Sequence, residues 1–191
     1  MRRSSKFLAF SVLAFLAVSA SCNNRASKMP NYGLVPEFHM TDSLGHDFDS
    51  KQLAGKVWVV DFIYTRCPGP CPRMTWQMHN VQSQVNRDPD VRFISISVDP
   101  DNDTPVALDA FAHHFGGPND QWYFLTGSPE TVHLLAHDVF KVGDVISKMD
   151  HSTKFMVVDK RGNLRGYYSG LGNDDISEIL QDIAALSQER S

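Results

Sequence analysis

The chain has 191 residues, of which 42% are hydrophobic and 21% charged, the composition of a globular protein with enough residues for one domain and a good core. Its formal net charge is −4 at pH 7, and it has no long run of basic residues, which argues against nucleic acid as a partner.

The first 21 residues are predicted to be a signal peptide. Arg2, Arg3 and Lys6 form a basic start, and residues 7–20 carry no charge, a run shorter than the roughly 20 residues of a membrane-spanning helix. The small residues that follow resemble the lipobox of a bacterial lipoprotein, in which Cys22 would carry lipid and become the first residue. We therefore expect an exported lipoprotein, anchored to the membrane through Cys22 and facing the periplasm or the cell exterior.

The alternative is ordinary cleavage near Ala20, which would leave Cys22 as a free thiol. Residues 1–21 hold three cations and no acid, so their removal changes the formal net charge from −4 to −7. Residues 22–34 are polar and lack apolar periodicity, and they are predicted to be a tether. The folded domain would then span residues 35–191.

Strands and helices alternate along this predicted domain. A turn-rich stretch at 42–45 predicts an N-terminal β-hairpin, and the apolar, β-branched run at 57–64 predicts a fully buried central strand followed by a helix at 74–81. Further strands are predicted at 91–98, 122–126, 154–159 and 164–169, and further helices at 105–115, 129–136 and 174–186. This order predicts an α/β fold with a central mixed sheet flanked by helices.

Cys67 and Cys71 stand where the central strand ends and a helix begins. A cysteine pair at this turn points to a thioredoxin-like fold, although the spacing has one residue more than the usual redox motif. A thiol at a helix start feels the positive end of the helix dipole. We therefore expect the pKa of Cys67 to be lowered, and Cys71, further into the first turn, to be less reactive. Such thiolates either attack disulfides or bind metals.

Four segments of the sequence resemble, in order and spacing, motifs of the Sco (SenC) family of copper chaperones. They are residues 62–72, 97–105, 122–127 and 150–153. The resemblance implies a thioredoxin variant that binds one copper ion, Cu(I) or Cu(II), through Cys67, Cys71 and His151. It also implies a role in assembling the binuclear copper site of cytochrome c oxidase. The partners would be the copper-site subunit of that oxidase and other copper chaperones or thiol reductants.

The residues agree with this resemblance, because soft thiolates and an imidazole suit copper in either oxidation state. His151 precedes the strand predicted at 154–159, where thiol oxidoreductases of this fold have a proline; the alternative for His151 is a surface position in a loop. A second function stays open, in which Cys67 and Cys71 are the redox-active pair of a thiol–disulfide oxidoreductase. Its substrates would be cysteines of the oxidase site or of other exported proteins. A peroxiredoxin-like peroxidase is disfavoured, because no separate resolving cysteine remains.

Other candidate ligands are weaker. His133 and His137 have the i, i+4 spacing of a helical metal pair, but their neighbours predict an ordinary buried helix. Met74 and Met78 share a helical face with Cys71, and we expect core packing rather than contact with copper. His113 and His114 are expected near a helix end, where a cationic histidine is favourable.

Three aspartates, Asp99, Asp101 and Asp103, resemble the start of a calcium-binding loop. Thr104 and Ala110 stand where that loop needs glycine and glutamate, so we reject the motif. Asp99 or Asp103 would instead orient the cysteine site, contact a partner, or serve in turns and caps.

Overall fold

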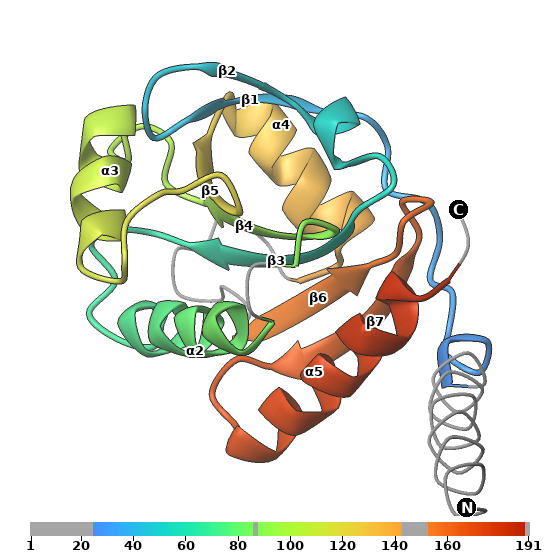
Figure 1. Ribbon diagram of the computed structural model, residues 1–191. Coiled ribbons are helices and arrows are strands. Elements are labelled where there is room, and N and C mark those ends of the chain that lie inside the picture. The colour runs from blue at the N-terminus through green and yellow to red at the C-terminus, as the bar shows by residue number, and fades with distance from the viewer. Residues whose placement is uncertain (1–24, 86–87, 143–152, 190–191) are drawn as a thin grey trace, which may run out of the picture.

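The computed structural model describes residues 25–85, 88–142 and 153–189. Its centre is a seven-stranded sheet in the order β2-β1-β5-β4-β3-β6-β7 (Figure 1). The strands are β1 His39–Asp42, β2 Asp47–Asp49, β3 Val57–Ile63, β4 Val91–Ser97, β5 Trp122–Thr126, β6 Lys154–Val158 and β7 Leu164–Ser169. β3, β4 and β5 run parallel, and the other neighbouring strands pair antiparallel, so the sheet is mixed as predicted.

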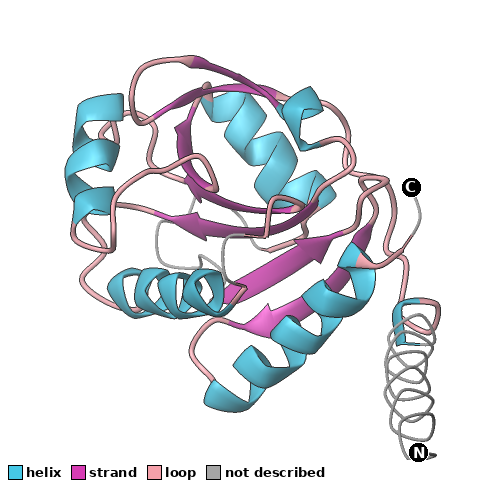
Figure 2. Cartoon of the chain, in the orientation of Figure 1, coloured by secondary structure: helices cyan, strands magenta, loops and turns pink. Residues whose placement is uncertain are grey.

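Helices cover both faces of this sheet (Figure 2). They are η1 Ser50–Leu53, α2 Cys71–Gln84, α3 Pro105–His113, α4 Pro129–His133, the π-helix η2 Leu134–Val139 and α5 Asn173–Ser187. Apolar side chains of α2, α3 and α5 fill one core, and those of α4 and η2 fill the other. This confirms the predicted thioredoxin-like fold with an N-terminal hairpin, β1–β2. Within the described ranges, every helix is too short or too polar to cross a bilayer.

β3 is the central strand, and all seven of its residues are buried, as its apolar sequence predicts. Its side chains alternate between the two cores. Val59 and Ile63 lie in the core under α2, and Val60 and Phe62 lie in the core under α4. By the same alternation, the side chain of Asp61 belongs to the α2 face of the sheet.

The helices predicted at 105–115 and 129–136 begin at the predicted residues, with Thr104 and Ser128 as their N-caps. The Thr104 hydroxyl accepts a hydrogen bond from the N–H of Ala107 at 3.3 Å, and the Ser128 hydroxyl accepts one from the N–H of Thr131 at 3.2 Å. In both helices a proline follows the cap, where its missing N–H costs no hydrogen bond. The second helix changes after five residues into a wider π-helical turn, which the sequence pattern does not signal.

Residues 25–35, which we name the strap, lie along β7. Ala26 is fully buried, and the guanidinium of the buried Arg165 donates hydrogen bonds to the carbonyls of Ala26 at 2.6 Å and Pro30 at 2.8 Å. The N–H of Tyr32 donates to the carbonyl of Leu164 at 2.9 Å. From Arg25 onward, the segment predicted as a tether is therefore held against the domain. The predicted signal peptide and Cys22 lie outside the described residues.

Candidate metal centre

Cys67 and Cys71 lie together at the carboxyl end of β3, where the chain turns into α2. Their side chains are 8% and 0% exposed, and both are free thiols. α2 begins at Cys71, with Pro70 as its N-cap. The prediction that Cys67 begins the helix and that Cys71 lies further into its first turn is therefore wrong. Pro68, Gly69 and Pro70 form the bend between β3 and α2, so Cys67 lies outside the helix.

Cys67 is the thiol that the surroundings favour as a thiolate. Burial raises its pKa, but hydrogen bonds to its sulfur outweigh that effect. The donors are the N–H and the thiol of Cys71, the N–H of Gly69 and the hydroxyl of Tyr64. The pKa of Cys67 is therefore lowered, in the predicted direction. The N–H groups of Gly69 and Cys71 have no partner within the helix, so they are available to the Cys67 sulfur. These individual hydrogen bonds stabilise the thiolate and lower its pKa.

Cys71 has the opposite character. Burial raises the pKa of its thiol, the backbone N–H of Tyr64 opposes this, and the neighbouring Cys67 and Asp61 raise it further. One thiol is thus prepared as a thiolate, while the other stays protonated and donates its S–H to the first. This asymmetry suits stepwise chemistry, because the two sulfurs lose their protons under different conditions.

Asp61 lies in the core beneath this pair. Burial raises the pKa of its carboxyl to about 7, against the opposing hydrogen bond that it accepts from the Ser95 hydroxyl at 2.7 Å. Ser95 in turn accepts a hydrogen bond from the indole N–H of Trp122 at 3.0 Å. The second carboxyl oxygen of Asp61 has no hydrogen-bond partner among the described residues. A fully buried acid in the central strand is costly, which marks it as a candidate functional residue.

Asp103 connects the cysteine loop to the loop after β4. Its carboxylate accepts hydrogen bonds from the N–H of Thr65 at 3.0 Å and from the Thr65 hydroxyl at 2.6 Å. It accepts a third from the Ser97 hydroxyl at 2.7 Å, and its side chain is fully buried. Thr65 lies two residues before Cys67, so Asp103 fixes the backbone that presents this sulfur. The orienting role proposed for Asp103 is the one that its contacts favour.

Asp99 makes a similar contact nearer the surface. It is 4% exposed and pairs with the guanidinium of Arg66, the residue before Cys67, at 3.1 Å. It also accepts hydrogen bonds from the amide of Asn102 at 2.8 and 3.0 Å. The carboxylate oxygens of Asp99 and Asp103 accept hydrogen bonds from protein donors. This agrees with the rejection of the calcium-binding motif.

The third predicted ligand, His151, lies outside the described residues. The chain resumes at Thr153, whose carbonyl accepts a hydrogen bond from the N–H of Gly170 at 2.7 Å. A Cβ atom on Gly170 would lie 3.1 Å from the side chain of Met74, one turn into α2. The segment just after His151 is therefore tied to the helix that begins at Cys71. Within the described ranges, no group of three or more His, Cys, Asp or Glu side chains is placed to hold a metal ion.

The weaker ligand candidates, two methionines and three histidines, have the structural roles that the sequence predicts. Met74 and Met78 are fully buried in the core, as predicted. His133 and His137 stack with ring centroids 5.0 Å apart, and the outer one, His137, bonds Asp138 at 2.9 Å. His113 is at the last turn of α3, where its ring nitrogen lies 2.8 Å from the carbonyl oxygen of Asp109.

Two residues of the site are missing from the sequence prediction, Tyr64 and Asp61. Tyr64 directly follows β3, three positions before Cys67, and its aromatic character in the sequence fits an ordinary strand residue. Asp61 is a charged residue within an otherwise apolar buried run, and that contrast is a signal that the sequence does contain.

Known proteins resemble this chain over most of its length. A model of the SCO1/SenC family matches residues 26–188. The SCO1 protein homolog of Bacillus subtilis is 34% identical over 184 residues, covering 92% of this chain and 93% of that protein. The crystal structure of a SCO1/SenC family lipoprotein from Bacillus anthracis has a TM-score of 0.74 at 35% identity, covering 84% of this chain and 98% of that one.

A third similar protein is BsSco, a member of the Sco family of cytochrome c oxidase assembly proteins in which a disulfide switch was identified. It has a TM-score of 0.75 at 33% identity and covers 85% of this chain and 98% of its own. Bradyrhizobium japonicum ScoI with copper bound has a TM-score of 0.67 at 24% identity, covering 81% of this chain and 99% of that one; this likeness is one of fold.

Proposed function

Since this chain belongs to the SCO1/SenC family, we propose that it binds one copper ion and delivers it during assembly of the binuclear copper site of cytochrome c oxidase. The observation that carries the proposal is the pair of free thiols in one bend at the end of β3, with Cys67 favoured as a thiolate. The related BsSco is described as an oxidase assembly protein, and B. japonicum ScoI holds copper.

The ligands would be the sulfurs of Cys67 and Cys71 and the imidazole of His151. Two thiolates and one imidazole form a soft donor set that suits copper rather than magnesium or calcium. The position of Thr153, tied through Gly170 to the first turn of α2, supports a third ligand from the segment before β6. His151 supplies the one imidazole in the sequence of that segment.

Loading requires both sulfurs as thiolates, so copper uptake releases protons. Cys67 is the better first ligand because its pKa is lowered, whereas Cys71 has to lose its proton against burial and a neighbouring negative charge. The raised pKa of Cys71 also favours release of the copper ion. Protonation of Cys71 would remove one ligand without disturbing Cys67, and the more weakly held ion could then pass to a recipient.

A second function is favoured by the asymmetry of the two thiols. In a thiol–disulfide oxidoreductase, the Cys67 thiolate would attack a substrate disulfide, form a mixed disulfide and displace one substrate thiolate. Cys71, after losing its proton, would attack Cys67 and displace the second substrate thiolate. The substrate gains two electrons and the protein keeps a Cys67–Cys71 disulfide. The disulfide switch identified in BsSco shows that a relative of this chain forms a disulfide, which supports this second function.

Substitution of His151 separates the two functions. Cu(II) needs a strong third donor beside two thiolates, whereas Cu(I) persists with two, so His151→Ala should remove most Cu(II) binding and its thiolate charge-transfer band. It should weaken Cu(I) binding less and leave the cysteine couple able to cycle with a dithiol. Cys67→Ser and Cys71→Ser should abolish all three properties. His137→Ala, an exposed histidine on η2, is the control.

The decisive readout is oxidase activity in cells at limiting copper. If copper transfer is the task, the His151→Ala strain should lose oxidase activity as the cysteine variants do. Full activity with His151→Ala, and none with the cysteine variants, would replace the copper proposal by the reductase.

We further propose that the chain is an exported lipoprotein anchored at Cys22. Its support is the lipobox-like sequence before Cys22 and the similar B. anthracis protein, which is described as a lipoprotein.

A further inference from the structure

The chain joins the domain far from its cysteines. Figure 1 shows the strap and the β6–β7 turn on one side of the molecule, and the start of α2 on the opposite side. Several hydrogen bonds fix the strap there, among them Arg165 to the carbonyls of Ala26 and Pro30, Tyr32 N–H to Leu164, and Val35 N–H to Gly162 at 2.9 Å. The buried Ala26 adds packing contacts. Movement of the strap relative to the sheet would break these bonds together.

The face around the strap combines exposed apolar side chains with cations. Tyr32 is 56% exposed and Leu34 is 68% exposed. A depression lined by Leu34, Leu53 and Trp58 has Lys51 and Arg161 in its lining, and these two side chains are 60% and 58% exposed. Apolar side chains that lie together on a protein surface, rather than scattered singly, are typical of an interaction site.

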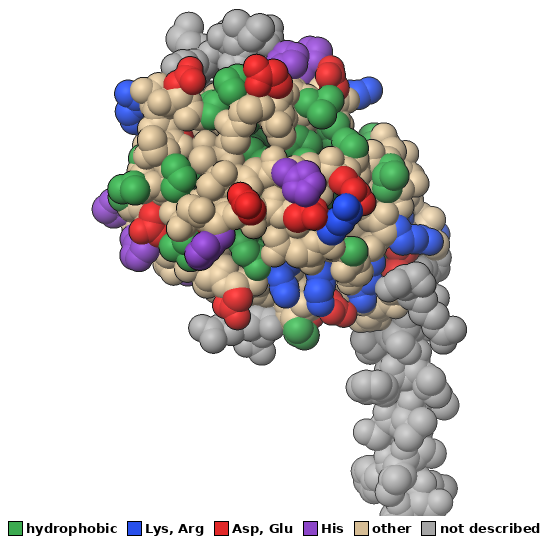
Figure 3. Space-filling view, turned by 90° about the horizontal axis from the view of Figure 1, so that it is seen from above, with side chains coloured by type: hydrophobic (Ala, Val, Ile, Leu, Met, Phe, Trp, Pro, Cys, Tyr) green, Lys and Arg blue, Asp and Glu red, His purple; other side chains and the backbone are tan. Residues whose placement is uncertain are grey.

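The segments that form this face, residues 25–35, 50–53 and 159–163, carry more cations than acids. Their one acidic residue, Asp159, is buried, and their cations are Arg25, Lys28, Lys51, Lys160 and Arg161. Acids of neighbouring segments pair with some of these cations: Glu37 with Lys51 at 3.1 Å, Asp90 with Lys160 at 3.2 Å and Glu189 with Arg161 at 3.4 Å. Figure 3 shows Lys and Arg side chains gathered on one side of the domain. The chain as a whole has a net charge of −4, so this gathering runs against the overall charge.

We propose that this face, formed by the strap, η1 and the β6–β7 turn, lies against anionic phospholipid headgroups and points the Cys67–Cys71 end of the sheet away from the bilayer. The inference rests on the proposed anchor. Two residues, Asn23 and Asn24, lie between Cys22 and Arg25, so the three steps of chain between them span at most about 11 Å. Because the strap is held from Ala26 onward, a bilayer that holds Cys22 can contact this face. It cannot reach Cys67 and Cys71, which lie at the opposite end of the domain (Figure 1).

The side chains fit this environment. A tyrosine prefers the boundary between headgroups and acyl chains, and lysine and arginine extend their cationic ends to the headgroups. The proposed contact therefore accounts for the exposed Tyr32 and Leu34 and for the excess of cations in one position. It assigns the strap a task beyond attachment, which is to set the orientation of the domain.

The test uses the full chain reconstituted in vesicles of phosphatidylcholine and phosphatidylglycerol. Tyr32→Trp places a fluorophore on the proposed face, and Val106→Trp places one at a 79% exposed site at the start of α3. Lipids with a nitroxide headgroup should remove most of the fluorescence that Tyr32→Trp adds over the parent, and leave that of Val106→Trp. Equal quenching of the two variants would overturn the proposal.

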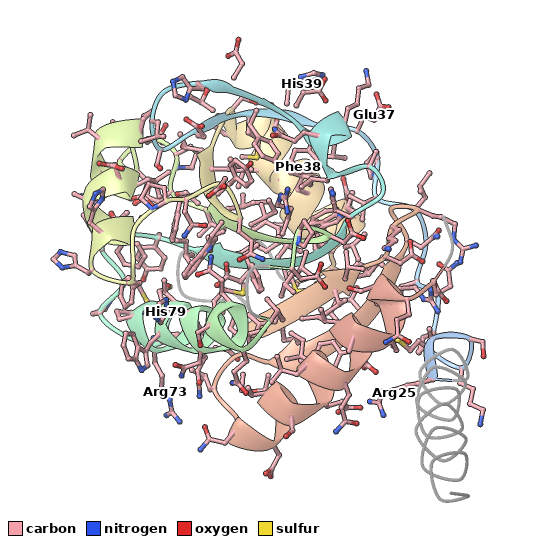
Figure 4. The ribbon with its side chains drawn as sticks, in the orientation of Figure 1. Arg25, Glu37, Phe38, His39, Arg73 and His79 are labelled. Carbon is pink, nitrogen blue, oxygen red and sulfur yellow. The ribbon has the colours of Figure 1, made fainter. Side chains whose placement is uncertain are left out.

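Charge reversal supplies the second arm. Lys51→Glu with Arg161→Glu should weaken the quenching of Tyr32→Trp, as should vesicles of phosphatidylcholine alone. The matched control is Arg73→Glu with Lys141→Glu; Figure 4 shows Arg73 on α2, well away from Arg25 and the strap. Equal effects of the two charge-reversed pairs would contradict headgroup recognition. If the chain fails to float with vesicles, the anchor and this inference both fall, whereas copper titration of the same preparation tests the ligand set separately.

Discussion

The hydroxyl of Thr65 donates a 2.6 Å hydrogen bond to the buried carboxylate of Asp103, which joins the cysteine loop to the loop after β4. Asp103→Asn replaces one accepting oxygen by a donor that faces other donors, since Thr65 and Ser97 both donate there. We expect a loss of about 1–3 kcal/mol in the free energy of unfolding and weaker copper binding. Chemical denaturation and copper titration measure the two effects.

The control is Asp101→Asn, which changes an exposed aspartate of the same loop. It should leave both quantities unchanged. If the two variants have the same unfolding midpoint and the same copper affinity, Asp103 does not hold the site.

Cys67 should be the first thiol to react with an alkylating agent. Its lowered pKa means that its reactivity rises with pH and levels off below the free-thiol value of about 8.5, whereas Cys71 stays slow. Tyr64→Phe removes one donor to the Cys67 sulfur, so the pKa of Cys67 should rise. If the lost hydrogen bond contributes about 1 kcal/mol, alkylation at pH 7 slows roughly fivefold.

Mass spectrometry of partly alkylated protein gives the order of the two thiols. Tyr123→Phe is the matched control, because its hydroxyl donates to the carbonyl of Asp120 far from the cysteines. Equal rates for Cys67 and Cys71 across neutral pH would contradict the asymmetry.

Asp61 should make the protein less stable as the pH rises. Its pKa is raised to about 7 in the folded protein, against 3.8 for an ordinary aspartate. Below about pH 4 the carboxyl is protonated in both states and has no effect. Between the two pKa values the unfolded chain loses this proton first, so the free energy of unfolding falls, and above pH 7 the loss is complete. Its size is on the order of a few kcal/mol.

Asp61→Asn should therefore gain stability relative to the parent between pH 4 and 7, and thermal unfolding across that range measures the gain. Asp90→Asn should show the opposite trend, because hydrogen bonds from Lys56 and Lys160 lower the pKa of Asp90. Its stabilising effect is present above the ordinary aspartate pKa and is lost at lower pH. A parallel pH profile for parent and Asp61→Asn would show that Asp61 ionises freely in the fold.

Cys22→Ser should release the mature protein in soluble form or block its processing. One acyl chain holds a protein to a bilayer only marginally, so we expect more than one on the native protein. Fractionation and mass spectrometry of the membrane fraction check both points, with Asn23→Ser as the control that keeps the cysteine. Unchanged membrane association of a protein without lipid would rule out this anchor.

Local signals predict much of the fold. The apolar run of β3, the Thr104–Pro105 pair and Ser128 each fix an element through its own sequence, and each is found where predicted. The start of α2 is less predictable, because three prolines at 68, 70 and 72 permit either a bend or a first helical turn. The structure forms a bend, which places Cys67 outside the helix. Hydrogen bonds from individual N–H groups, rather than the helix dipole, therefore lower the pKa of Cys67.

Long-range contacts explain what the sequence does not reveal. The strap has no apolar periodicity, and much of what holds it is the set of hydrogen bonds that its carbonyls accept from Arg165. The hydrogen bonds of Asp103 to Thr65 cross 38 positions of sequence, so neither residue signals the other. His151 remains a prediction, since it lies outside the described residues.

The pairing of Arg165 with Ala26 also has a consequence for the order of events during synthesis. The two residues are 139 positions apart, and Arg165 belongs to β7, the last strand made. The segment around Ala26 therefore has no docking partner until β7 has been made. For that whole interval it is undocked and open to proteolysis, and it closes onto the domain once the sheet is complete.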